Sequence, residues 1–369
     1  MDNKKIRDLF FVNKNSIYLN HASTGVIPEP SLEKMKNVLN DFARHGSLGN
    51  EYINEILGKG RQMIAKLIKN DPKNITFTSN TSQGILIVLL NIPFKEGDEV
   101  LVMEECFPAA KYVAEYNLPG INTRYVKLKM KDPVEVAKEE IKDKTKAVIL
   151  DYVQYFTGEK LPIKELSRFL RERDIFLIID GIQALGSIYL DVKKEDIDIL
   201  ACGGSKWLNG PQGTGFLYVS PWAFGKMKKV HTGWLGAPWK NFQNFTNLPQ
   251  PFNDARRFET GTRNIVGISG LTESIEILFE YGIKNVEKKI QKLNTLIFRG
   301  LMDKGYEILT PKDRMAGIVT GRPKKGSAEK VYKKITEKNI VISLRNNALR
   351  FSPHFYNSVD EIEKVIEII

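Results

Sequence analysis

Lys206 is the residue whose surroundings best suit it for chemistry. It follows a short apolar run within ILACGGSKWLNGPQGTGFLYV, in a turn rich in glycine. Glycines let the backbone approach a ligand closely, and a lysine beside Trp207 and Leu208 is poorly placed to stay in solvent. Desolvation lowers the pKa of a lysine and makes its amine nucleophilic, which Schiff-base chemistry requires. The GxxxxGK[ST] spacing of a P-loop is absent.

Two further segments carry polar residues directly after apolar runs. Asp180 ends IFLIID, where a buried carboxylate needs a cationic or hydrogen-bonding partner, although capping of the following helix explains the same residue. In ITFTSNTSQGILIVLLN a strand ends at Thr78 and a helix is expected to begin near Ser82. The free backbone amides and the hydroxyls of Thr81 and Ser82 suit an anion, and ordinary N-capping remains the alternative.

The three segments together fit one ligand. A phosphate at a helix start, an acid for a pyridine nitrogen and a lysine for an aldehyde are what pyridoxal 5'-phosphate needs. The acid precedes the lysine by 26 residues, as the numbers of Asp180 and Lys206 give. We therefore predict this cofactor, held as an internal Schiff base on Lys206. No metal is expected, because Cys106 and Cys202 lack metal-ligand spacing and make no disulfide framework.

The elements that must position these residues alternate between strand and helix. Runs such as IFLII are apolar throughout, which indicates a parallel sheet covered by helices on both faces. Ligands bind beyond the carboxyl ends of such strands. We predict an α/β fold with strands at Ile75–Thr78, Glu99–Met103, Ala147–Asp151, Ile175–Asp180, Ile197–Ala201 and Gly215–Val219.

The pattern changes after about residue 260. Long amphipathic helices over 265–281 and 284–304 precede short strands near 306–309, 317–320, 340–343 and 349–352. Ser358 and Glu361 are spaced as the capping box of a last helix. Since single cores stop growing near ~250–300 residues, we predict two domains: residues 1–260, with an N-terminal segment and the large domain, and a small α+β domain over 261–369.

Composition limits the class of protein. Of the 369 residues, 42% are apolar and 27% charged, and no run is long and apolar enough for a membrane span or a signal peptide. A soluble, cytoplasmic protein is expected. The net charge of +11 raises nucleic-acid binding as a competing function. The lysines are scattered among acids, as in KKEDID, so a solvated surface is the preferred interpretation.

The sequence resembles the class V aminotransferase family of fold type I enzymes, which includes cysteine desulfurases, kynureninases and isopenicillin N epimerase-like proteins. The likeness runs from YLNHASTG to LRFSPHFYNS, and its most specific motifs are IIDGIQALG, GGSKWLNGPQGTGFLYV and RFETGT. The resemblance implies a large domain with a mostly parallel sheet, a smaller C-terminal α+β domain, and a homodimer whose active sites lie at the subunit interface.

Several roles follow from the resemblance. Lys206 is expected to form the internal aldimine and to move protons at the substrate's α-carbon. Asp180 would pair with the pyridinium nitrogen, and Gln183 would bind the phenolic oxygen of the ring. Arg350, in LRFSP, matches the position that holds the substrate α-carboxylate through a bidentate contact.

The resemblance also implies a phosphate site. Thr81, Ser82 and Ser205 would hold the phosphate, and Thr262 would reach it from the partner subunit. Phe107, in EECFPAAKY, stands where desulfurases carry a histidine that stacks on the cofactor ring, so Phe107 is the stacking candidate, with a core position as the alternative.

The segment VQYFTG resembles kynureninases and epimerase-like relatives rather than desulfurases. It brings Gln154 or Tyr155 near the cofactor without deciding between them. The region SLRNNALRFSP lacks the loop cysteine that a desulfurase needs, and Cys106 and Cys202 lie elsewhere. Desulfurase activity is therefore disfavoured.

We predict an enzyme acting on a small amino acid, with an aminotransferase as the leading assignment. An epimerase of the isopenicillin N epimerase type, or a kynureninase-like lyase, is the alternative. These reactions share the first steps and differ in which bond aligns with the ring's π-system. No membrane or nucleic-acid partner is expected.

Overall fold

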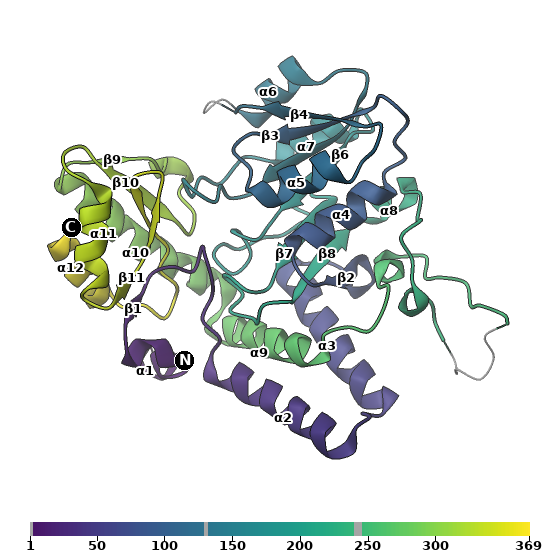
Figure 1. Ribbon diagram of the computed structural model, residues 1–369, viewed down its shortest axis with the longest axis horizontal. Helices are drawn as coiled ribbons and strands as arrows, with labels where there is room; N and C mark the ends of the chain where they lie inside the picture. The colour runs from purple at the N-terminus through teal and green to yellow at the C-terminus, as the bar shows by residue number, and fades with distance from the viewer. Residues whose placement is uncertain (1–2, 129–131, 240–245) are drawn as a thin grey trace.

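A computed structural model describes residues 3–128, 132–239 and 246–369. Its two larger sheets lie side by side, each with its own hydrophobic cluster (Figure 1). The larger sheet has seven strands: β2 (Ile75–Thr78), β3 (Glu99–Met103), β4 (Asn122–Val126), β5 (Thr145–Asp151), β6 (Phe176–Asp180), β7 (Ile199–Gly203) and β8 (Gly215–Val219).

The larger sheet is mostly parallel, as predicted. Its strand order is β2-β8-β7-β6-β5-β3-β4, and only β8 runs against its neighbours β2 and β7. Strands β3, β6, β7 and β8 are buried at every residue, and β5 at every residue except Lys146, because helices cover both faces. The carboxyl ends of β5, β6 and β7 therefore lie next to one another along one edge of the sheet.

Helices surround this sheet in two groups. The helices between its strands are α4 (Thr81–Asn91), α5 (Pro108–Tyr116), α6 (Pro133–Glu140), α7 (Lys164–Arg171) and, after β8, α8 (Pro221–Lys226). A second group packs together below the sheet in Figure 1: α2 (Glu29–His45), α3 (Asn50–Ile68) and α9 (Ile265–Tyr281). Helix α2, in the N-terminal part of the chain, thus packs on α9.

The smaller sheet is antiparallel, with the order β12-β13-β10-β9. Its strands are β9 (Tyr306–Ile308), β10 (Val319–Pro323), β12 (Ser343–Arg345) and β13 (Ala348–Phe351). It is covered by α10 (Ile283–Asp303), α11 (Ala328–Thr336) and α12 (Val359–Ile368). The capping box predicted for Ser358 and Glu361 is present at the start of α12.

The N-terminal segment binds the C-terminal part of the chain. After α1 (Asn3–Asp8), strand β1 (Ile17–Tyr18) pairs in parallel with β11 (Ile340–Val341), and Asn20 bridges Ser352. This pairing carries the YLNHASTG segment past the smaller sheet towards the larger one. The division at residue 260 stays a prediction.

Several strand predictions need correction: the strand expected near 317–320 is β10 (Val319–Pro323), and the one expected near 340–343 is divided between β11 and β12. Strand β7 covers Ile199–Gly203 rather than Ile197–Ala201, because Asp196 turns at a φ of 55° and Ile197 still donates to Val192. Strand β4 was not predicted, since its side chains are mostly polar or partly exposed at the sheet edge. None of the described helices is long and apolar enough to cross a membrane. The cytoplasmic location stays a prediction.

Candidate active site

A cavity of about 220 Å³ opens where the carboxyl ends of β6 and β7 meet the smaller sheet. Residues from seven separate stretches of the chain line it, and they include both Asp180 and Lys206. The lining consists of Ala22, Ser23, Asn80, Thr81, Ser82, Phe107, Ala109, Tyr155, Asp180, Ile182, Gln183, Lys206, Arg345 and Arg350. Seven of the nine residues predicted for the site are among them.

Lys206 enters this cavity from the loop after β7. Its neighbour Trp207 is fully buried, and Gly204 donates to the Thr214 carbonyl, so the loop is anchored on both sides of the lysine. Burial lowers the pKa of the Lys206 amine to about 8. The negative charge of Asp180 opposes this effect and raises the pKa of Lys206. The amine is therefore partly neutral at physiological pH, as a nucleophilic lysine must be.

Asp180 ends β6 beside Lys206 and is almost fully buried. Its Oδ1 accepts a hydrogen bond from the Ile182 N–H at 2.9 Å. Burial raises the pKa of Asp180 to about 6, and the Ile182 bond and the Lys206 charge oppose that rise. The carboxylate is thus mainly ionised near neutral pH, and it faces the cavity.

The first turn of α4 forms another wall of the cavity. Asn80 caps the helix by accepting from the Gln83 N–H at 2.9 Å, so neither Thr81 nor Ser82 is the capping residue. The Thr81 hydroxyl accepts the Gly203 N–H at 2.9 Å, which fixes the helix start against the end of β7. Its own proton stays available to a ligand, and the helix start favours an anion.

Gln183 is held rigidly at the cavity wall. Its Nε2 donates to the Ala22 carbonyl at 3.0 Å, and its Oε1 accepts from the Trp207 indole at 2.8 Å. An amide nitrogen has two protons, so one remains for a ligand oxygen. The same network ties the N-terminal segment to the lysine loop.

Phe107 and Tyr155 form an aromatic side of the cavity. Their rings meet edge to face at 5.2 Å, and the Lys206 Nζ lies 5.3 Å from the Phe107 ring centroid. Phe107 is thus a cavity residue rather than part of the core. Of the two residues left open in VQYFTG, Tyr155 lines the cavity, whereas Gln154 does not and is buried behind it.

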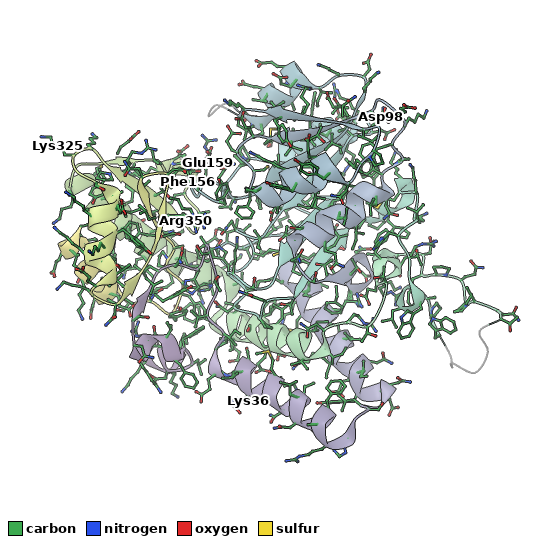
Figure 2. All side chains as sticks on the ribbon, viewed as in Figure 1. Lys36, Asp98, Phe156, Glu159, Lys325 and Arg350 are labelled. Carbon is green, nitrogen blue, oxygen red and sulfur yellow. The ribbon has the colours of Figure 1, made fainter. Side chains whose placement is uncertain are left out.

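Arg350 lies on β13, on the side of the smaller sheet that faces the larger one (Figure 2). It is only 1% exposed, and its two Nη atoms donate to the Tyr155 carbonyl at 2.6 Å and to the Ser23 hydroxyl at 2.7 Å. Its Nε has no hydrogen-bond partner among the residues that the structure describes. Burial lowers the pKa of Arg350 to about 9, and the neighbouring Arg345 lowers it further.

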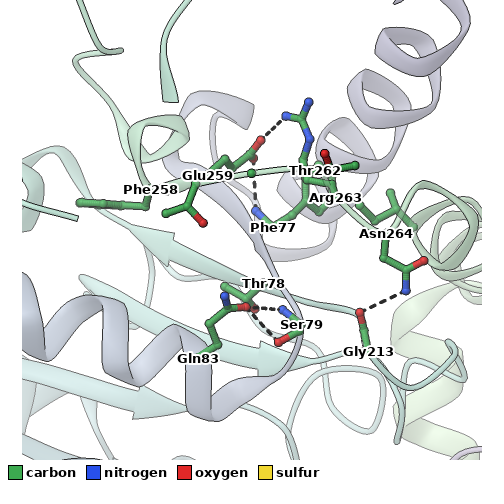
Figure 3. Close-up of a pocket in the computed structure, with 13 residues that line it drawn as sticks. Phe77, Thr78, Ser79, Gln83, Gly213, Phe258, Glu259, Thr262, Arg263 and Asn264 are labelled. Carbon is green, nitrogen blue, oxygen red and sulfur yellow. Dashed lines mark hydrogen bonds and ion pairs between the residues drawn. The ribbon is translucent and has the colours of Figure 1, made fainter. Parts of the chain in front are cut away.

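Two predicted residues lie outside this cavity. Ser205 precedes Lys206, and its carbonyl accepts from the Gly25 N–H at 2.7 Å. Thr262 lines a second pocket, shown in Figure 3, together with Ser79 and Gln83 from the start of α4. A phosphate-binding role for Ser205 or Thr262 stays a prediction.

Several polar residues at or beside the cavity were not predicted, among them Ser23, Arg345 and Asp151. Ser23 lines the cavity and lies within YLNHASTG, a segment that carried the family resemblance without any role being predicted for Ser23. Arg345 lies on β12 and lines the cavity; its position follows from the hairpin that joins it to β13. Asp151 ends β5 directly beside Asp180, and only the register of the sheet reveals that pairing.

Asp151 and Asp180 form a buried carboxyl pair. Burial raises the pKa of Asp151 well above its usual range, and the neighbouring charge of Asp180 raises it further. Asp151 accepts the Phe107 N–H at 3.2 Å through Oδ2, while its Oδ1 has no hydrogen-bond partner in the described part of the chain. Because like charges resist joint ionisation, Asp151 holds its proton more strongly and Asp180 carries the negative charge.

Comparison with known proteins identifies the family. A model of the family described as aminotransferase class-V matches residues 17–365. The chain belongs to this family. Class-V enzymes use pyridoxal phosphate, so the match confirms the predicted class of enzyme and its cofactor. The residues that line the cavity fit pyridoxal phosphate, because the Lys206 amine, the buried Asp180 carboxyl and the start of α4 all line the same cavity.

Relatives of several names share the family. The chain is 24% identical to an uncharacterized aminotransferase, YcbU, of Bacillus subtilis, over 99% of this chain and 97% of the relative. It is 25% identical to a probable cysteine desulfurase of Pyrococcus abyssi, over 96% and 93% of the two chains. These similarities support the family and leave the reaction open.

A solved structure confirms the fold. C-DES, as a lysine-to-alanine mutant with glycine covalently linked to its pyridoxal phosphate cofactor, matches with a TM-score of 0.91. The identity is 23%, over 98% of both chains. The predicted fold, with a mostly parallel large sheet and a smaller α+β part, is thereby confirmed.

The depressed pKa of Lys206 predicts selective labelling of the cofactor-free protein. A small acylating reagent should reach half-maximal labelling of Lys206 near pH 8, where an ordinary lysine requires a pH near ~10.4. Because Asp180 raises the pKa of Lys206, Asp180→Asn should move the midpoint to still lower pH. Peptide mass spectrometry across pH measures both, with exposed Lys325 as the internal reference. A midpoint above pH 10 would contradict the assignment.

Proposed function

We propose that this chain transfers the amino group of a small amino acid to a 2-oxo acid, with pyridoxal phosphate attached to Lys206. The observation that carries the proposal is the common cavity of Lys206, Asp180 and Arg350. It brings together an amine for the cofactor aldehyde, a carboxylate for the ring nitrogen and a guanidinium for the substrate carboxylate. Each of these groups is buried or nearly so, where electrostatic contacts are strong.

Pyridoxal phosphate, when bound, supplies an aldehyde and a protonated ring that withdraws electrons from the substrate's α-carbon. Asp180 would accept the N–H of the ring nitrogen and favour its protonated form by its negative charge. Thr81 and Ser82 would hold the phosphate at the start of α4. The free proton of the Gln183 amide would bind the phenolic oxygen.

Lys206 would take and return the proton at the α-carbon. An amine with a pKa of about 8 is populated in both its neutral and its protonated form near neutral pH. Brønsted behaviour makes such a group an efficient acid and base at that pH. The loop that carries Lys206 is anchored through the bond from buried Trp207 to Gln183, so the amine returns to the same place in each turnover.

Arg350 would hold the α-carboxylate of the substrate. Two of its five N–H groups donate to Tyr155 and Ser23, which fix the plane of the guanidinium. The remaining groups, including the unpaired Nε, are available for a bidentate contact. The substrate is thereby oriented relative to Lys206.

An epimerase or a lyase is the second candidate. Both would use the same residues, and the bond that breaks depends on the orientation of the substrate. The similarity to C-DES, whose structure with cysteine persulfide names it a cystine C–S lyase, supports the lyase alternative.

Desulfuration remains disfavoured for this chain. Strands β12 and β13 are joined by the two residues Asn346 and Asn347, which leave no room for a cysteine-bearing loop. Cys106 and Cys202 are buried, and burial raises the pKa of both thiols well above the usual value. Neither thiol is available as an accessible thiolate.

We also propose a homodimer in which Thr262 reaches the cofactor phosphate of the second copy. In a single copy Thr262 lies outside the Lys206 cavity, in the pocket that adjoins the start of α4. Sedimentation of the holoenzyme should show a species of twice 42.0 kDa, and Thr262→Ala should weaken cofactor binding. A monomer with full activity would contradict this arrangement.

The reaction is tested by a single turnover. The holoenzyme is mixed with one amino acid at a time, without any 2-oxo acid, and the products are quantified by mass spectrometry. Transamination predicts one equivalent of the matching 2-oxo acid per active site, and continuous turnover only after an oxo acid is added. Lys206→Ala should slow the step by roughly 10²- to 10⁴-fold, because the proton carrier is lost.

The other outcomes each support a different function. Racemised amino acid, or a released side-chain fragment, would replace transamination by the epimerase or lyase alternative. A protein without a visible absorption band, retained on nucleic acid in a strongly salt-dependent way, would favour the non-catalytic alternative. The control variant Lys325→Ala changes an exposed lysine and should behave as the unmodified protein.

A further inference from the structure

Two arginines of the cavity lack carboxylate partners. Most arginines in the described ranges form an ion pair, such as Arg124 with Glu99 and Glu140. In the same ranges neither Arg345 nor Arg350 has one, and the Nε atom of each is buried without a hydrogen-bond partner. Unpaired, partly desolvated cations in a cavity indicate that the missing anions belong to a ligand.

The β12–β13 hairpin fixes the two guanidinium groups side by side. Asn346 and Asn347 both have positive φ, of 48° and 55°, as a two-residue type I′ turn requires. The turn pairs Arg345 with Ala348 and Ser343 with Arg350. Since side chains alternate along a strand, Arg345 and Arg350 share one face as diagonal neighbours.

The opposite face of this hairpin is apolar. Leu344 pairs with Leu349 there and packs in the smaller hydrophobic cluster. The register therefore cannot slip by one residue without burying both arginines in that cluster. Arg345 is held at the cavity by the same constraint that holds Arg350.

The charges in the cavity require more than one anion. Arg345 lowers the pKa of Arg350 and also that of Lys206, so three cationic groups repel one another, and the Asp180 carboxylate offsets the charge of Lys206. The α-carboxylate assigned to Arg350 neutralises one of them. The phosphate has its own site at the start of α4, so Arg345 remains without an anion.

We propose that Arg345 binds a second acidic group on the substrate, so that the preferred substrate is an acidic amino acid such as a dicarboxylate. This inference rests on the proposed function, because it takes the α-carboxylate at Arg350 as its reference point. Arg345 then acts as the specificity-determining residue: it rejects neutral side chains by leaving its own charge unpaired.

The test compares unreactive acids with one and two carboxylates. Glutarate, succinate and butyrate are titrated into the holoenzyme by calorimetry. The two dicarboxylates should bind more tightly than butyrate, and Arg345→Gln should weaken them roughly 10- to 100-fold, as expected for loss of a charged hydrogen bond. The same variant should leave butyrate affinity within about twofold. Arg322→Gln, on the neighbouring β10, removes an arginine outside the cavity and should change none of these affinities.

Each contrary result identifies a different error. Equal weakening of butyrate and glutarate would assign Arg345 to the α-carboxylate instead. Loss of cofactor affinity in Arg345→Gln would assign it to the phosphate, and unchanged dicarboxylate affinity would remove it from the ligand site. A failure of the proposed function would look different. In that case no amino acid would release an oxo acid, while the enzyme would still bind the dicarboxylates more tightly than butyrate.

Discussion

The attraction between Asp180 and Lys206 is the interaction on which the site depends. Asp180 is buried and Lys206 is largely so, and burial alone would neutralise each of them, raising the pKa of the acid and lowering that of the amine. Their opposite charges resist that tendency and keep the acid mainly ionised and the amine close to its titration point. A carboxylate that holds a cofactor ring and an amine that exchanges protons both require this balance.

The fold produces the balance through adjacent strand ends. Parallel strands β5, β6 and β7 deliver Asp151, Asp180 and the Lys206 loop to one edge, and α4 brings an anion-binding turn to the same place. The N-terminal segment and the smaller sheet close the other side with Ser23 and Arg350. Chain segments more than 300 residues apart in sequence are thus joined by one hydrogen bond.

Local patterns in the sequence predicted much of this arrangement. Apolar runs ending in polar residues located Asp180 and Lys206, since both features are contained in a few neighbouring letters. Asp151 and Arg345 were missed because their importance depends on strand register. Asp151 lies opposite Asp180 on the adjacent strand, and the β12–β13 hairpin aligns Arg345 with Arg350. Such cross-strand relations carry no signal in a single stretch of sequence. The approach of Thr262 to a second copy, which we propose, would likewise be a property of assembly.

The central claim is that Lys206, of all the lysines in this basic chain, carries the cofactor beside Asp180. The most direct measurement is borohydride reduction of the purified, coloured protein, followed by proteolysis and mass spectrometry of the modified peptide. The account predicts a single pyridoxyl modification on Lys206 in the GGSKWLNG segment. Modification of another lysine, or an equal yield of adduct in Lys206→Ala protein, would contradict it.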